Sequence, residues 1–242
     1  MKEQLYTIPV NDAFQGGCEC PLCSLRKGLE QDAIEFTLGP SYMEDDNRAV
    51  TDELGFCEKH IQTLYQQKNR LGLALILSTH MSKVTNDLKK LSTESGTPGK
   101  GLLKKKAAPS SMGEYAARLE HNCFICNRVD NVFNRYVETI FHLYRKDPVF
   151  SQKIKASKGF CTYHYALLFD HAPEYLSKEL LDTFLSDIQS AYFSNMQRMQ
   201  EDLEWFINQF DYRYQNEPWK NAKDALPRAV LKTHSSITPD LE

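Results

Sequence analysis

The chain has 242 residues, of which 41% are hydrophobic and 25% charged, and its formal net charge is −3. Such a chain can bury a core as one large or two small domains. A nearly balanced charge gives no general attraction to nucleic acid or anionic membrane, so we expect neither as a partner. The start of the sequence lacks the apolar run of a secretory signal, and no apolar stretch is long enough to span a membrane. We therefore expect a cytoplasmic protein.

Cysteine usage agrees with this expectation. There are seven cysteines, an odd number. An odd count without an export signal argues against a secreted disulfide framework. A reducing compartment, in which thiolates stay available to a metal, fits the sequence better.

The first predicted half covers residues 1–92 and is helical. It contains Cys20-Pro21-Leu22-Cys23, and apolar residues then continue at helical spacing until Gly39-Pro40 ends the segment. Cys57-Glu58-Lys59-His60 follows, and apolar steps of four and three predict an amphipathic helix over 77–91. Gly, Ser, Pro and Lys then dominate residues 93–113, which are predicted to be a linker.

The second predicted half covers residues 114–210 and repeats the same order. Cys123-Phe124-Ile125-Cys126 opens an apolar helical face that Asp147-Pro148 interrupts. Cys161-Thr162-Tyr163-His164 follows, and apolar residues at steps of three and four predict a long helix over Ser177–Phe210. Convincing runs of alternating β-branched residues are missing. The predicted fold class is therefore all-α, with two similar helical halves and a long helix in the second.

The repeated cysteine and histidine pairs predict two metal sites. Two such pairs supply three thiolates and one imidazole, a closed tetrahedral set for Zn²⁺. Pairing within each half needs the least loop closure, although crosswise pairing between the halves is a second possibility. Local pairing places Cys20, Cys23, Cys57 and His60 in one site and Cys123, Cys126, Cys161 and His164 in the other. We expect two structural Zn²⁺ ions, with Fe–S clusters as the alternative.

Two further potential ligands occupy equivalent positions in the repeat. Cys18 lies two residues before Cys20, and His121 lies two residues before Cys123. They could be spare ligands, exchangeable ligands or a relay toward a second metal. They could also be two unrelated residues, and we favour this last interpretation. A solitary histidine on a helix, such as His80, His142 or His171, is usually a surface or core residue.

The C-terminal segment, residues 211–242, is rich in aromatic and charged side chains. Arg213, Glu217 and Trp219 could line a site for a small molecule or peptide. The alternative is a strap in which Trp219 packs on the helices and the charges face solvent. We favour the strap, because exposed ion pairs are common and weak.

The combination of these motifs resembles a known family. Cys-Pro-Leu-Cys followed by Gly-Phe-Cys-x-x-His, its repetition in the second half, and the Asp-Tyr-Arg-Tyr…Glu-Pro-Trp tail are similar to an uncharacterised bacterial family classed as a domain of unknown function. The resemblance spans most of the chain. It implies a bacterial origin and no particular mechanism.

Three functions are consistent with the sequence. The first is a zinc-stabilised helical module or scaffold that binds an unidentified protein or small molecule. The second is a redox or metal-handling protein with Fe–S or labile metal centres. The third is an enzyme with a site between the halves under the C-terminal strap, although no catalytic motif is present. The sequence predicts neither the substrate nor the oligomeric state.

Overall fold

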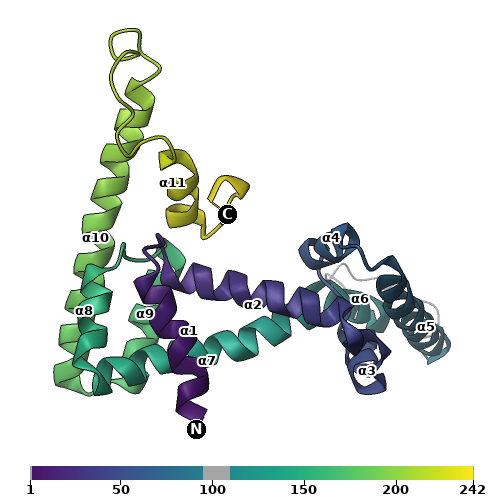
Figure 1. Ribbon diagram of the computed structural model, residues 1–242. Coiled ribbons are helices and arrows are strands. Elements are labelled where there is room, and N and C mark those ends of the chain that lie inside the picture. The colour runs from purple at the N-terminus through teal and green to yellow at the C-terminus, as the bar shows by residue number, and fades with distance from the viewer. Residues whose placement is uncertain (1, 95–109, 242) are drawn as a thin grey trace, which may run out of the picture. The chain divides into compact units, whose positions relative to one another are not determined.

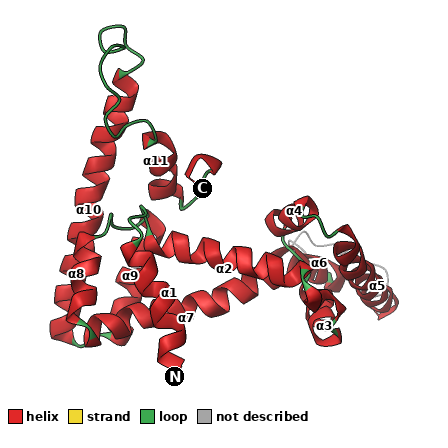
Figure 2. Ribbon diagram, in the orientation of Figure 1, coloured by secondary structure: helices red, strands yellow, loops and turns green. Residues whose placement is uncertain are grey.

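The computed structural model describes residues 2–94 and 110–241, and every regular element within them is a helix (Figure 2). This confirms the predicted all-α class. None of these described helices combines the length and apolar character needed to cross a membrane. In chain order (Figure 1), the elements are α1 (Lys2–Gln15), α2 (Pro21–Leu38), η1 (Pro40–Met43), α3 (Asp45–Leu54), α4 (Glu58–Gln66), α5 (Arg70–Glu94), α6 (Ser111–His121), α7 (Phe124–Lys146), α8 (Pro148–Ala156), α9 (Thr162–Tyr175), α10 (Lys178–Asn208), α11 (Ala225–His234) and η2 (Pro239–Leu241).

Several helix ends follow local sequence signals. Helix α2 ends at Leu38, directly before the predicted Gly39-Pro40 break. The Asp147 carboxylate accepts a hydrogen bond from the Val149 N–H at 2.9 Å and so caps α8, whose first residue is Pro148. The long helix α10 nearly matches the predicted Ser177–Phe210. Most of the predicted linker 93–113 lies outside the described residues.

Contacts divide the chain into two compact units. The first unit comprises Met1–Gly28 and Val132–Glu242, and the second comprises Leu29–Asn131. Helices α2 and α7 therefore each contribute residues to both units. These boundaries differ from those of the predicted halves, 1–92 and 114–210, because each unit combines segments from both halves.

The first unit is built around α10. Helices α8, α9 and α11 all pack on α10 (Figure 1), and α1 packs on α8. Its core contains four phenylalanines that are fully buried, namely Phe141, Phe150, Phe160 and Phe184. Tyr144 on α7 donates a hydrogen bond to the buried Asp187 on α10 at 2.8 Å, which pairs two polar groups inside this apolar environment.

The second unit packs α3 against α5, with α4 and α6 also contacting α5. Its core cluster includes Leu64, Leu73, Ile76 and Phe124. The Phe124 N–H also donates a hydrogen bond to the Gly55 carbonyl oxygen at 3.0 Å. This bond joins the segment before Cys57 to the start of α7, directly after Cys123, and thereby brings two cysteine pairs together.

Candidate metal centres

All four cysteine-containing pairs lie at the beginning of a helix. Cys57 and Cys161 are the N-cap residues of α4 and α9, and Cys20 and Cys123 directly precede α2 and α7. The partial positive charge at a helix N-terminus stabilises thiolates. The backbone N–H of Cys126 points to the Cys123 sulfur at 3.5 Å. These four helix starts are suited to holding anionic sulfur ligands.

The first metal centre lies in the first unit and consists of Cys20, Cys23, Cys161 and His164, all buried. The Nδ1 atom of His164 lies 3.4, 3.3 and 3.2 Å from the sulfur atoms of Cys20, Cys23 and Cys161. The sulfurs of Cys23 and Cys161 are 3.6 Å apart. The four donor atoms therefore converge on one point.

The second metal centre lies in the second unit and consists of Cys57, His60, Cys123 and Cys126. The Nδ1 atom of His60 lies 3.2, 3.2 and 3.4 Å from the sulfurs of Cys57, Cys123 and Cys126. The sulfurs of Cys57 and Cys126 are 4.0 Å apart. His60 and Cys123 are buried, whereas Cys57 and Cys126 are half-buried.

These distances fit a tetrahedral metal ion. With Zn–S bonds of about 2.3 Å and Zn–N bonds of about 2.0–2.1 Å, the edges of the tetrahedron are about 3.8 Å between sulfurs and about 3.6 Å between sulfur and nitrogen. The sulfur–nitrogen separations, 3.2–3.4 Å, are slightly shorter than these edges. The sulfur–sulfur separations of 3.6 Å for Cys23 and Cys161 and 4.0 Å for Cys57 and Cys126 lie on either side of them. The donor set of three thiolates and one imidazole is also typical of a structural zinc site.

The predicted local pairing of ligands is wrong. All eight predicted ligands belong to the two clusters, but Cys20 and Cys23 join Cys161 and His164 instead of Cys57 and His60. The continuous helix α2 explains this, because it fixes the spacing between Cys23 and Glu30. The Nε2 atom of His60 lies 2.6 Å from Glu30, seven residues after Cys23 on that helix, and seven residues of α-helix rise about 10 Å. Helix stiffness thus outweighs the lower loop-closure cost of local pairing.

A carboxylate orients the histidine of the second centre. Glu30 accepts a hydrogen bond from the Nε2 atom of His60 at 2.6 Å and pairs with Lys59 at 2.5 Å. The hydrogen bond from His60, followed by that from Lys59, lowers the pKa of Glu30 to about 2 despite burial. Burial works against a charged His60, but hydrogen bonds to Cys123 and Glu30 outweigh it and raise the pKa of His60 to about 10 in the metal-free protein. Carboxylate–histidine pairs of this kind fix a metal-bound ring.

The surroundings of the first centre are different. The Nε2 atom of His164 is buried without a hydrogen-bond partner, and its ring lies against Phe133 with centroids 5.4 Å apart. The Cys161 sulfur instead receives hydrogen bonds from the His164 N–H at 3.4 Å and from the Ser235 hydroxyl at 3.1 Å. Ser235 follows α11, so the C-terminal segment contacts a ligand of this centre directly.

The thiols divide into protonated and ionised groups when no metal is bound. Burial is the main cause that raises the pKa of Cys20 and of Cys126 to about 12. Hydrogen bonds to Cys161 and Cys20 raise the pKa of Cys23. By contrast, hydrogen bonds from Cys20 and Cys23 lower the pKa of Cys161, and the neighbouring imidazole lowers that of Cys123 to about 6 although burial opposes it. A metal cation must therefore displace protons from both centres.

Cys18 and His121 are not members of either cluster. The Cys18 sulfur lies 3.6 Å from the Ala13 carbonyl oxygen, and burial raises the pKa of this thiol. His121 is exposed at the end of α6. His80 makes a 2.8 Å hydrogen bond to the Asp52 carbonyl oxygen, as expected for a histidine with a structural role.

The three candidate residues of the C-terminal segment lie beyond the end of α10. Arg213 is exposed and forms an ion pair with Asp211 at 2.7 Å, and Glu217 is also exposed. Trp219 is half-buried and packs on Phe206, with ring centroids 5.7 Å apart. This arrangement resembles the strap more than a shared site, and the candidate role of these residues stays a prediction.

The structure thus defines a class: helical proteins with two centres, each built from three cysteines and one histidine. The sequence also matches a family of unknown function, DUF6062, over residues 1–240, and the chain belongs to this family. This confirms the predicted membership of a domain-of-unknown-function family. Neither a curated protein nor a solved structure matches the chain.

Proposed function

We propose that both centres bind Zn²⁺ and that the protein is a zinc-stabilised helical module that binds a partner. The observation that carries the zinc assignment is the convergence of the donor atoms, which in each centre all lie within 4.8 Å of one another. A cluster of two or four irons spreads its protein ligands over different irons and so holds them further apart than the edge of one tetrahedron. The same geometry therefore supports zinc over Fe–S clusters.

A structural role follows from the coordination number. Catalytic zinc keeps a position open for water or substrate, whereas each of these centres offers four protein ligands. Each centre also joins distant parts of the sequence: Cys23 and Cys161 are 138 residues apart, and Cys57 and Cys126 are 69 apart. Zinc binding contributes an apparent free energy of about 10–16 kcal/mol in zinc-finger peptides. We infer that it supplies much of the stability of both units.

We further propose a reducing, cytoplasmic location, because thiolates that bind metal must not be oxidised to disulfides. A helical protein with closed metal centres is suited to binding rather than to metal-centred chemistry. The partner belongs to the proposal as an unidentified protein or small molecule.

Elemental analysis of the purified protein tests the metal assignment. We expect two zinc ions per chain, no iron or sulfide, and no visible absorption. Removal of zinc by a strong chelator should lower helix content measured by circular dichroism, and added Zn²⁺ should restore it. A brown protein with iron and sulfide would overturn the zinc assignment, and unchanged helicity and melting temperature after complete removal of zinc would overturn the structural role.

A further inference from the structure

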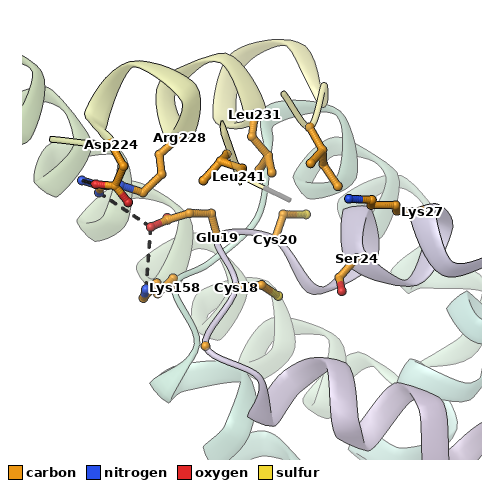
Figure 3. Close-up of a pocket in the computed structure, with 12 residues that line it drawn as sticks. Cys18, Glu19, Cys20, Ser24, Lys27, Lys158, Asp224, Arg228, Leu231 and Leu241 are labelled. Atoms are coloured by element: carbon orange, nitrogen blue, oxygen red, sulfur yellow. Dashed lines mark ion pairs between the residues drawn. The ribbon is translucent and has the colours of Figure 1, made fainter. Parts of the chain in front are cut away.

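A cavity of about 290 Å³ lies in the first unit beside the first metal centre (Figure 3). One wall is formed by the segment around Glu19 and Cys20 and by the first turns of α2. Residues of α11 and of the segment that follows it form the opposite wall. Ligand pockets commonly occupy roughly 300–1,000 Å³, so this cavity is suited to a small metabolite.

Two buried polar atoms of the cavity lining have no hydrogen-bond partner. They are Oε1 of Glu19 and Nε of Arg228, whose side chains are only 5% and 7% exposed. The first accepts hydrogen bonds and the second donates them. Buried polar groups are normally satisfied. A ligand that offers both a donor and an acceptor would satisfy this pair.

The charges around the cavity favour an anion. Figure 3 shows the Glu19 carboxylate between Arg228 and Lys158, whose nitrogens lie 3.7 and 3.9 Å from Oε1. Glu19 also pairs with Arg198 at 2.5 Å and with Lys232 at 3.4 Å, so this one carboxylate faces four basic side chains. Asp202 and Asp224 balance part of this charge, each at 2.8 Å from Arg228.

The rest of the wall on the α11 side is apolar. Leu231, Ile237 and Leu241 line the cavity from the C-terminal segment. The amine of Lys27 approaches from α2 on the other side (Figure 3). A ligand that fits must therefore combine an anionic group with a short apolar part.

We propose that this cavity binds a small organic acid that carries a hydrogen-bond donor beside its carboxylate and a short apolar group. The carboxylate accepts from Arg228 and faces Lys158, the donor reaches Oε1 of Glu19, and the apolar group contacts Leu231 and Ile237. This names a ligand class for the binding function proposed above and leaves the zinc centres with their structural role.

Calorimetry and thermal shift on the zinc-loaded full chain test this assignment. The probe is 2-hydroxy-4-methylpentanoate, and 4-methylpentanoate and inorganic phosphate are the comparison compounds. We expect the hydroxy acid to bind and to raise the melting temperature. It should bind about tenfold more tightly than 4-methylpentanoate, which leaves the Glu19 atom unpaired.

Two variants locate the binding. Arg228→Lys retains the charge but removes the Nε donor, and Ile237→Trp fills the cavity from a partly exposed position; each should weaken binding at least about tenfold. Leu226→Trp, a matched change at an exposed residue of α11 outside the lining, should bind normally. Zinc content, measured in every variant, separates loss of the pocket from loss of the metal centre.

Absence of binding by the hydroxy acid at millimolar concentration would overturn the proposal while leaving the zinc assignment intact. Equal binding of phosphate, unaffected by Ile237→Trp, would also overturn it by revealing only a general anion contact. Full affinity in both cavity variants with normal zinc content would place the ligand elsewhere and reject the assignment.

Discussion

Glu30 holds the imidazole of His60 through a 2.6 Å hydrogen bond to Nε2, while Nδ1 of the same ring faces the three sulfurs of the second centre. The corresponding nitrogen of His164 in the first centre is buried without a hydrogen-bond partner. The two halves of the sequence repeat their metal ligands, but they do not repeat the group that orients the histidine. The two centres should therefore respond differently to a change at Glu30.

Glu30→Gln should weaken metal binding at one centre only. The Glu30 carboxylate orients the His60 ring and makes its metal-binding nitrogen more basic. Loss of this carboxylate removes both effects, and changes of this kind reduce metal affinity about 10–100-fold. Competition with a chromophoric chelator should show one weakened and one unchanged zinc per chain. Glu35→Gln, an exposed position on the same helix, is the control. Equal weakening of both centres would contradict this prediction.

The crosswise pairing predicts the zinc content of double variants. Cys20 and Cys161 belong to the same centre, so Cys20→Ser combined with Cys161→Ser should lose one zinc. Cys20→Ser combined with Cys57→Ser damages both centres and should lose two. Elemental analysis distinguishes the two results. Loss of two zinc ions in the first double variant and of one in the second would instead support pairing within each half of the sequence.

The metal ligands could be predicted from the sequence, but their pairing could not. Residue type and spacing identify Cys20, Cys23, Cys57 and His60 as ligands, because few other functions need soft donors in that pattern. Pairing depends on where α2 directs the chain, and neither its stiffness nor the contact with Glu30 is visible in the spacing. Loop closure alone was therefore an insufficient criterion.

Helix α10 could also be predicted from the sequence, because apolar residues recur at steps of three and four throughout the predicted segment 177–210.

The cavity could not be predicted from the sequence. Glu19, Arg228 and Lys232 come from distant parts of the chain, and each alone resembles an ordinary surface residue. Only the packing of α11 buries them together. The C-terminal segment carries no clear helix start and stop signals, so α11 was not predicted from the sequence.

Acidification should release the metals. Without metal, the pKa values of Cys20 and Cys126 are about 12, so both thiols are protonated at neutral pH and zinc must displace their protons. Because protons compete with zinc, affinity should fall by at least about tenfold for each unit of decrease in pH. Chelator competition at pH 8, 7 and 6 measures this. A pH-independent affinity would contradict protonated thiols in the metal-free centres.

Cys18→Ser should retain both metals. The Cys18 sulfur contacts the Ala13 carbonyl oxygen and is not part of the first cluster. Removing it should therefore leave two zinc ions and a nearly unchanged melting temperature, whereas Cys20→Ser should lose one zinc. A matching loss of zinc in both variants would show that Cys18 is a ligand.

Gly159→Ala should be the most damaging of three glycine substitutions. Gly159 precedes Phe160-Cys161 and has φ +72°, and a Cβ there would lie 2.6 Å from the Ala191 carbonyl oxygen of α10. Backbone strain of about 1–3 kcal/mol adds to a comparable cost of overpacking. Denaturant unfolding should therefore show a loss of about 2–6 kcal/mol in stability, and zinc should bind the first centre more weakly because Cys161 is displaced.

The repeated motif supplies the comparison. Gly55 precedes Phe56-Cys57 and has φ +60°, but its Cβ would meet the His80 side chain at 3.0 Å, and a side chain can shift more easily than backbone. Gly55→Ala should therefore cost less than Gly159→Ala and affect the second centre. Gly28, inside α2, has nothing within 4 Å of an added Cβ, so Gly28→Ala should stabilise the helix by about 0.5–1 kcal/mol. Equal costs at all three positions would show that the positive φ of Gly55 and Gly159 is unimportant for presenting the metal ligands.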